Sequence, residues 1–281
     1  MTPSPPARTG TDAAEAAAWA TWQDSPWGRL RYRVVAATLR RWLASVAEGP
    51  LRVLDAGGGD GRDAVQLALQ GHDVTVLDTA PDALDLARTA AAAAGVGDRL
   101  HTVAADLEDL HALAALTRHR QGGSGSFDVV LCHDVLQHRG SPAQVRADVS
   151  TLASSLRPGG LLSLLAPNPA ADVVHAALGG DPAQAWVLLD APQTVDEVTG
   201  RTVLRLDPDD VLAAVRAAGC EPAGRAGVLS VTGLLERLAT ADPRLVDERL
   251  VDDLEHLEVA LSDREPHLRS ARSWHLAARR R

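Results

Sequence analysis

Residues 51–78, LRVLDAGGGDGRDAVQLALQGHDVTVLD, constrain the fold more strongly than any other stretch of the chain. Two apolar runs, 51–54 and 74–77, each lead into an aspartate, Asp55 and Asp78. Between them lie a cluster of glycines and a helical pattern of apolar residues. A strand, a glycine loop, a helix and a second strand form the nucleotide-binding half of a doubly wound sheet. The stretch therefore predicts an α/β fold with a doubly wound sheet; together with the apolar runs along the rest of the chain, it predicts a mostly parallel seven-stranded sheet with helices on both faces.

The glycine loop matches two cofactor motifs. Glycines after a strand let a ligand approach the main chain, and an acid about 20 residues further on, here Asp78, can bind ribose hydroxyls. A dinucleotide motif, G-x-G-x-x-A, begins at Gly59, whereas the S-adenosylmethionine (SAM) motif, an acid followed by G-x-G-x-G, begins at Asp55. An anionic Asp55 would repel a pyrophosphate but suits the ammonium and sulfonium charges of SAM. The loop therefore favours SAM, with a nicotinamide dinucleotide as the alternative, and the absence of G-K-[ST] excludes a P-loop.

Composition limits the possible partners. The chain has 281 residues, 46% of them hydrophobic, so a sizeable core can form. Its formal net charge is −9 and every positive side chain is arginine, so it has no general attraction for nucleic acid or anionic membranes, although a local arginine patch remains possible. We find no apolar run of about 18 residues and no signal pattern, and we predict a cytoplasmic protein that does not contact the membrane. Cys132 and Cys220 are predicted to be buried thiols, and no metal-ligand spacing is present.

The rest of the chain continues the alternation of helices and strands. We predict a helix over 30–46 that lies above the ligand site, a strand over 161–166 after a turn at 157–160, and a closing strand over 270–278. The expected organisation is a tail and the start of a lid over 1–27, a cofactor-binding domain over 28–278 with a substrate-side insertion at about 167–204, and a basic tail over 279–281.

Several side chains follow predicted strands and are candidates for the site. Asp106 lies just past a strand, where it can accept from the adenine amine or cap a helix. His133 and Asp134 follow the next strand at its carboxyl end, which opens on the ligand crevice. His133 is the first candidate for a general base and His175 the second; the alternative for His133 is a hydrogen-bonded structural role. Arg31 is either a solvated side chain or a clamp on a carboxylate.

The motifs VLDAGGGDG, VTVLD, AAD, FDVVLCHDVLQH and LRPGGLLSLL resemble those of the Rossmann-like SAM-dependent methyltransferases. Within that superfamily, GRLR at 28–31, HDVLQH, LRPGG and DREPHLRSARSWHLAAR are similar to the bacterial tRNA 5-carboxymethoxyuridine methyltransferases, which esterify a carboxylate on a wobble uridine. The resemblance implies that Arg31, Gly57 and Gly58 hold the methionine end of the cofactor. It also implies that Asp78 binds the ribose, that Asp106 lies by the adenine and that His133 lies near the methyl group. Asp55 and Gly59 belong to the same predicted cofactor loop.

The sequence leaves two classes of methyl acceptor, a small molecule and a tRNA nucleoside. The methylated atom is either an oxygen, which includes a carboxylate oxygen, or a nitrogen. Where the resembled group tends to carry lysines, this chain has APQTVDEVTGR, which includes Asp196 and Glu197. Loss of positive charge weakens phosphate binding. The candidate acceptor-binding residues are Asn168, His175, Arg201, Arg269 and Arg272, of which the three arginines would face phosphates in a tRNA enzyme. A nicotinamide oxidoreductase and a non-catalytic partner subunit are the competing hypotheses, and the oligomeric state is not predicted.

Overall fold

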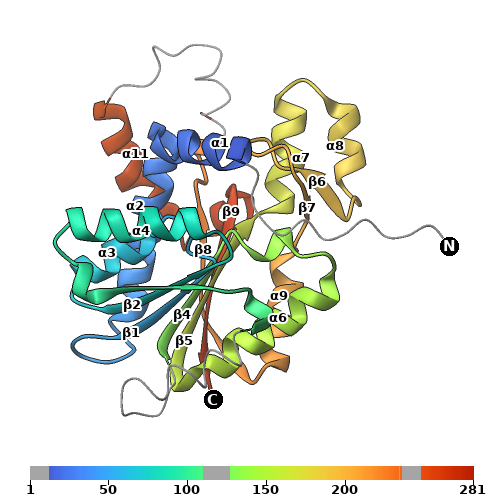
Figure 1. Cartoon of the computed structure of the whole chain (residues 1–281). Helices are drawn as coiled ribbons and strands as arrows, with labels where there is room; N and C mark the ends of the chain where they lie inside the picture. Colours follow the sequence, from blue (N-terminus) through green and yellow to red (C-terminus); the bar gives the residue numbers. More distant parts are fainter. Residues whose placement is uncertain (1–12, 110–126, 234, 236–247) are drawn as a thin grey trace.

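The computed structural model describes residues 13–109, 127–233, 235 and 248–281 (Figure 1). Its centre is a seven-stranded sheet in the order β3-β2-β1-β4-β5-β9-β8. β3, β2, β1, β4 and β5 run parallel, whereas β9 lies between β5 and β8 and runs antiparallel to both. The prediction of an α/β, mostly parallel seven-stranded sheet is therefore confirmed. The strands are β1 (Arg52–Ala56), β2 (Asp73–Asp78), β3 (Leu100–Ala104), β4 (Phe127–His133), β5 (Leu156–Pro167), β8 (Cys220–Val228) and β9 (Ser273–Arg280).

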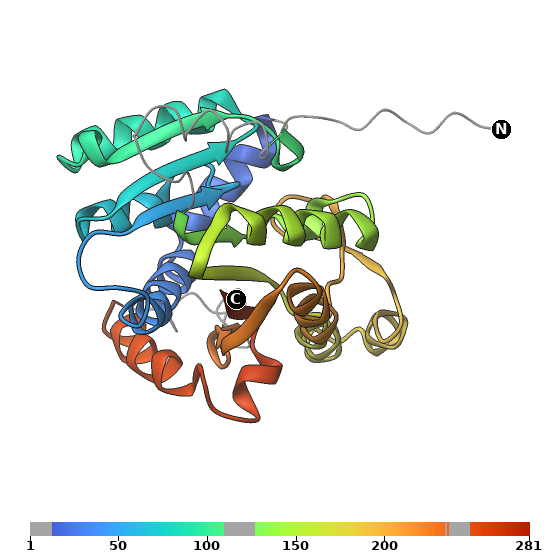
Figure 2. The ribbon, with the colours of Figure 1, turned by 90° about the horizontal axis from the view of Figure 1, so that it is seen from below.

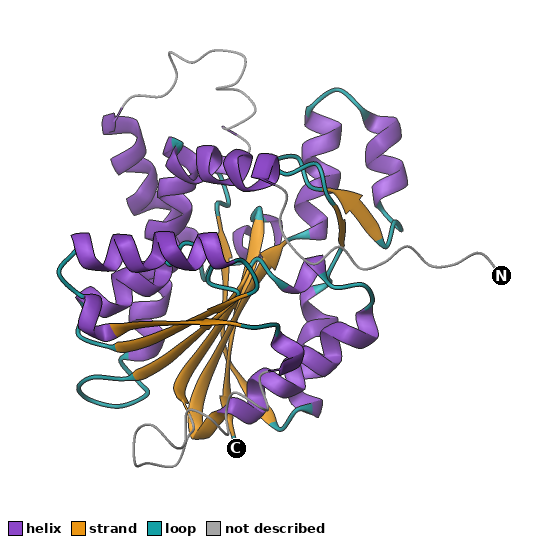
Figure 3. Ribbon diagram, in the orientation of Figure 1, coloured by secondary structure: helices purple, strands orange, loops and turns teal. Residues whose placement is uncertain are grey.

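Helices cover both faces of the sheet (Figures 2 and 3). One face carries α2 (Pro26–Leu43), α3 (Arg62–Leu69) and α4 (Pro81–Ala93), with α11 (Glu248–Leu261) packed on α2. The other face carries α6 (Pro142–Ser155) and α9 (Pro208–Ala217). The remaining short elements are η1 (Gly97–Arg99), η2 (Leu107–Asp109), η3 (Leu136–His138) and α12 (His267–Ser270).

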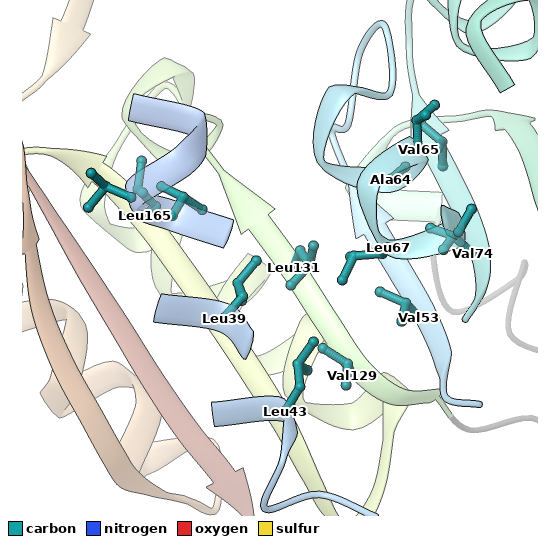
Figure 4. Packing of buried hydrophobic residues seen from close by; sticks show 14 of the residues in the cluster. Leu39, Leu43, Val53, Ala64, Val65, Leu67, Val74, Val129, Leu131 and Leu165 are labelled. Atoms are coloured by element: carbon teal, nitrogen blue, oxygen red, sulfur yellow. The ribbon is translucent and has the colours of Figure 1, made fainter. Parts of the chain in front are cut away.

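The core is built almost entirely from leucine, valine and alanine, because aromatics make up only 3% of the chain. Figure 4 shows Leu39 and Leu43 of α2 lying against Leu131 and Val129 of β4. Alternate residues of a strand point to opposite faces, so one strand contributes to two buried clusters. A strand buried on both sides reads as a continuous apolar run, which is the pattern of β4.

Capping residues set where the helices begin. Ser141 accepts a hydrogen bond from the backbone N–H of Gln144 at the start of α6, as its Ser-Pro sequence predicts. Ser25 caps α2 in the same way by accepting from Gly28 at 3.1 Å. The helix predicted over 30–46 therefore starts four residues earlier, at Pro26.

Two predicted boundaries at the sheet need correction. β5 begins at Leu156 rather than 161, because Leu156 pairs with Phe127 of β4 and a register shift accommodates the turn residues within the strand. The predicted basic tail over 279–281 is wrong for its first two residues, since Arg279 and Arg280 belong to β9 and pair with β8. The Arg280 side chain also donates to the Ser154 carbonyl at 2.7 Å.

The segment expected as an insertion after β5 lies outside the main sheet (Figure 1). It contains α7 (Pro169–Leu178), α8 (Pro182–Leu188) and a two-stranded hairpin of β6 (Gln193–Val195) and β7 (Thr202–Leu204). At the other end of the chain, α1 (Ala13–Asp24) precedes α2. The predicted tail over residues 1–12 and the glycine- and serine-rich loop over 121–126 lie outside the described residues. Among the helices that the structure describes, none has the length and apolarity needed to cross a membrane.

Candidate active site

A cleft of about 1890 Å³ opens at the carboxyl ends of the parallel strands. Its floor is formed by the glycine loop after β1, the tip of β2 and the end of β4, and its walls come from α1 and the insertion. The pocket that binds one drug-sized ligand typically has a volume of about 300–1,000 Å³. The cleft therefore has room for a cofactor and a second molecule together.

The glycine loop lies so close to its neighbours that side chains are excluded. A Cβ at Gly57, where φ is +79°, would lie 2.4 Å from Val135 Cγ2. A Cβ at Gly58 would lie 2.5 Å from Asp55 Oδ2. The loop thus presents its bare main chain to the cleft, as the cofactor motif predicts.

Asp55 lies beneath the loop and is only 3% exposed. Burial is the main cause that raises the pKa of its carboxyl well above the ordinary value, and the negative charges of Asp63 and Asp78 add to it. A cation in the cleft would relieve this repulsion. The electrostatics of the floor therefore favour a positively charged ligand over a pyrophosphate.

Asp78 and Asp106 present carboxylates to the same cleft. Asp78 Oδ2 accepts from Gly59 N–H and its Oδ1 from Ala80 N–H, both at 2.9 Å, so the carboxylate is fixed at the tip of β2 with lone pairs left for a ligand. Asp106 accepts from Glu108 N–H at 3.0 Å and from Arg139 at 3.3 Å. It thus starts η2 and lines the cleft at the same time, and its contact with the adenine amine stays a prediction.

Arg31 is buried, with 4% of its surface exposed, which excludes a solvated side chain. Its Nη2 donates to Asp134 Oδ2 at 2.6 Å, and its guanidinium lies 4.5 Å from the centre of the Tyr32 ring. Its Nη1 is 3.9 Å from Asp63 Oδ2 and has no hydrogen-bond partner among the described residues. A buried cationic donor without a partner is costly, so a ligand carboxylate at this end of the cleft would satisfy it. This observation fits the carboxylate of the SAM methionine end.

His133 lines the cleft, but both of its ring nitrogens are engaged by the protein. Nδ1 lies 2.9 Å from Asp63 Oδ2 and Nε2 lies 3.0 Å from Ser163 Oγ. A general base needs a nitrogen that can reach the acceptor, so a catalytic role of His133 requires its ring to leave one of these partners and stays a prediction. The hydrogen-bonded structural alternative describes this geometry.

Three of the predicted acceptor residues line the cleft. His175 Nδ1 lies 3.1 Å from Nη1 of Arg272, whose Nη2 is 3.9 Å from Glu197. Arg201 Nη1 lies 3.6 Å from Glu15 Oε2 of α1, so an ion pair links α1 to the insertion. The arginines expected to face phosphates are thus partly neutralised by the protein's own acids.

Asn168 and Arg269 are not among the described residues that line the cleft. The contact predicted between Asn168 and the acceptor is corrected, whereas the predicted contact of Arg269 with a phosphate stays a prediction. The Asn168 amide donates to the carbonyls of Arg269 and Ala271, each at 2.8 Å, and its oxygen caps α7. Arg269 is exposed and pairs with Glu265 at 2.8 Å. Asn168 therefore fixes the turn before the acceptor wall instead of binding the acceptor itself.

Asp63 and the tryptophans of α1 line the cleft without having been predicted from the sequence. Asp63 lies in the first turn of α3, where an acid is common beside a helix N-terminus, so its contact with His133 has no local signal. Trp19 and Trp22 are one helical turn apart and stack with ring centroids 5.0 Å apart on the wall of the cleft. Their spacing could have indicated this pair once the helix was assigned.

The fold, the bare glycine loop over Asp55 and the unpaired donor of Arg31 are those expected of a Rossmann-like SAM-dependent methyltransferase. A family model described as a methyltransferase domain matches residues 53–160. The chain is 31% identical over 255 residues to the tRNA 5-carboxymethoxyuridine methyltransferase of Escherichia coli (strain K12), covering 90% of this chain and 89% of that protein. The chain therefore belongs to the SAM-dependent methyltransferases.

Other relatives and solved structures agree with this assignment. The chain is 30% identical over 192 residues to the ubiquinone biosynthesis O-methyltransferase of Bordetella avium (strain 197N), covering 66% of this chain and 70% of that one. The structure of magnesium protoporphyrin IX methyltransferase from Synechocystis PCC 6803 with bound SAH has the same fold, with a TM-score of 0.58, 18% identity and coverage of 96% and 95%. The protein is an enzyme with SAM as its cofactor, which removes the nicotinamide and non-catalytic alternatives.

Proposed function

We propose that this enzyme methylates a carboxylate, and that its acceptor is the 5-carboxymethoxyuridine of tRNA. The observation that carries the proposal is the extent of the similarity to the Escherichia coli tRNA enzyme, 90% of this chain and 89% of the relative. A match of that length reaches beyond the cofactor half, residues 53–160, into segments that line the acceptor side of the cleft.

The hydrogen bonding in the cleft supports a carboxylate as the methylated group. Bound SAM supplies an activated methyl group on a sulfonium. A carboxylate is ionised at neutral pH and needs no base, whereas an amine or hydroxyl acceptor benefits from one. The nitrogens of His133 are both engaged, and Nδ1 of His175 lies against Arg272. The protein then contributes alignment of the acceptor for in-line transfer and a site shielded from water.

Arg272 and Arg201 are the groups that would hold the acceptor carboxylate. Their contacts with Glu197 and Glu15 are 3.9 and 3.6 Å, longer than a hydrogen bond. An acceptor carboxylate at hydrogen-bonding distance would form the stronger interaction, since charge-assisted bonds to guanidinium are short and often bidentate. Arg272 follows the turn fixed by Asn168, whose backbone N–H donates to the Arg272 carbonyl at 2.9 Å.

A small-molecule carboxylic acid is the second candidate acceptor. Among the described side chains that line the cleft, carboxylates outnumber arginines, and the β6–β7 hairpin adds Asp196 and Glu197 to its wall. Phosphate contacts dominate nucleic-acid affinity, and acids in the wall oppose them.

The test is transfer of a radiolabelled methyl group from SAM to tRNA that carries 5-carboxymethoxyuridine and, in parallel, to a panel of small carboxylic acids. Mild alkali releases a methyl ester as methanol but leaves N-methyl groups and ethers in place. Alkali-labile label in tRNA, with a rate that falls as salt rises, supports the proposal. Alkali-stable label refutes the carboxylate, and label confined to the small acids refutes the tRNA.

A further inference from the structure

A chain of hydrogen bonds runs from below the cofactor site into the middle of the sheet. Asp63 Oδ2 and His133 Nδ1 are 2.9 Å apart, His133 Nε2 and Ser163 Oγ are 3.0 Å apart, and Ser163 Oγ and His275 Nε2 are 2.8 Å apart. The four residues come from α3, β4, β5 and β9, and Ser163 and His275 are fully buried. Polar groups so deep in a leucine-rich core require a reason beyond packing.

The charge of Asp63 fixes the direction of the first hydrogen bond in the chain. Burial by itself raises the pKa of Asp63, but the hydrogen bond with His133 and the charge of Arg31 bring that pKa below the ordinary value, so the carboxylate only accepts. His133 Nδ1–H must then donate to Asp63, and the Ser163 hydroxyl, which can both donate and accept, links His133 Nε2 to His275 Nε2.

His275 forms the far end of the chain. Burial is the main cause that lowers the pKa of its imidazole well below the ordinary value, and the nearby His133, Arg31 and Arg41 add to it, so the ring is neutral. Its Nδ1 is buried and has no hydrogen-bond partner among the described residues.

The chain ends beside Arg31, the residue at the methionine end of the cofactor site. Asp63 Oδ2, which accepts from His133, stands 3.9 Å from Arg31 Nη1 and attracts it without forming a hydrogen bond. Asp134 holds the other nitrogen, Nη2, at 2.6 Å. Nη1 therefore keeps its donors while the guanidinium is held in place from two sides.

We propose that Ser163 is a positioning residue for the cofactor: through His133 it holds Asp63 back from Arg31, so that Nη1 stays available to the carboxylate of SAM. Without the hydroxyl, His133 Nε2 loses its hydrogen-bond partner and the ring is no longer fixed. Asp63 then gains the freedom to pair directly with Nη1 and to compete with the cofactor. This inference concerns the cofactor site and does not depend on which acceptor is methylated.

The test compares two ligands on the wild type and on Ser163→Ala by calorimetry. S-adenosylhomocysteine carries the amino-acid carboxylate, and 5′-methylthioadenosine carries the adenosine and sulfur without it. Ser163→Ala should weaken S-adenosylhomocysteine binding about tenfold, the size expected for one charge-assisted hydrogen bond, and leave methylthioadenosine unchanged. Equal weakening of both ligands, or no weakening of either, would overturn the proposal, because a general loosening of the sheet does not select for the carboxylate.

A double-mutant cycle with Arg31→Met tests whether the effect passes through the guanidinium. With Arg31 removed, Ser163→Ala should weaken S-adenosylhomocysteine no further, whereas additive losses would contradict the proposed route. Ser155→Ala is the matched control, since its buried hydroxyl donates to the Thr151 carbonyl in α6, away from the chain of hydrogen bonds. It should leave both ligands at wild-type affinity.

Ser163→Thr and Ser163→Val separate the hydroxyl from packing, because the two new side chains have the same shape and differ only in that group. The Thr variant should bind S-adenosylhomocysteine more tightly than the Val variant, with equal affinities for methylthioadenosine. If Ser163→Ala does not fold, as judged by thermal melting, the comparison of the Thr and Val variants replaces it, with the affinity for S-adenosylhomocysteine again compared with that for methylthioadenosine. Equal binding of S-adenosylhomocysteine by the two variants would refute a role for the hydroxyl.

Discussion

Substitution of Glu258 should destabilise the protein far more than any exposed acid of the same helix. Its carboxylate is fully buried between α11 and the turn after β8. It accepts from the N–H groups of Ser230, Val231 and Thr232 at 2.6, 2.8 and 2.7 Å, and from the Thr232 hydroxyl at 2.6 Å. All four donors would lose their acceptor in Glu258→Ala.

The magnitude follows from the donors left behind. An unsatisfied buried donor costs about 1–3 kcal/mol, and removing the charged partner of a buried polar cluster costs about 3–5 kcal/mol in total. Three backbone N–H groups cannot turn toward another acceptor without moving the chain. Glu258→Ala should therefore lower the free energy of unfolding by about 3–5 kcal/mol, and Glu258→Gln should lower it by a similar amount because its NH₂ group faces donors.

The assay is urea unfolding followed by circular dichroism, with Glu255→Gln as the control. Glu255 lies one turn away on α11 and forms a surface pair with Arg33 at 3.0 Å, an interaction worth about 0–1 kcal/mol. A loss below about 1 kcal/mol for Glu258→Ala, or equal losses for Glu258→Gln and Glu255→Gln, would refute the reasoning.

Three further predictions concern the cleft. Asp55→Asn should raise the melting temperature of the ligand-free protein at pH 7 by a few degrees, because a carboxyl whose pKa is raised in the folded state opposes folding when it ionises. This gain in melting temperature should vanish as the pH falls toward the ordinary carboxyl pKa, where the Asp55 carboxyl is protonated in both states. The affinity for SAM should drop. Asp78→Ala should reduce S-adenosylhomocysteine affinity more than about tenfold by calorimetry, since it removes the acceptor at the tip of β2 and the anchor of Gly59; near-wild-type binding would defeat the assignment. Arg272→Gln should raise the KM for the acceptor about tenfold or more while S-adenosylhomocysteine binding stays within about twofold, and a change confined to the cofactor would contradict its place on the acceptor side.

Local patterns in the sequence were sufficient to predict the cofactor half of the molecule. The glycine loop, Asp55 and Asp78 lie within one β-α-β unit, whose geometry is set by neighbouring residues. The start of α6 follows equally directly from Ser141 and the proline after it.

Long-range contacts account for what the sequence did not reveal. The pairing of His133 with Asp63 joins residues 70 positions apart, so no periodicity could show that the His133 ring was already engaged. The amide of Asn168 reaches carbonyls more than 100 positions away and acts as a cap. Arg280, which was predicted to lie in a tail, belongs to β9 because it pairs with Cys220 of β8.

The antiparallel course of β9 separates two tasks along the sequence. Because β9 runs against its neighbours, its first residue, Ser273, and the preceding Arg272 stand at the same edge of the sheet as the glycine loop. The glycine loop and the tip of β2 lie in one contiguous segment, whereas the opposite wall is assembled from α1, the β6–β7 hairpin and the start of β9. If the wall binds the acceptor, as we propose, a change of acceptor preference is expected to arise there, by evolution or by engineering, without altering the proposed methyl-donor site.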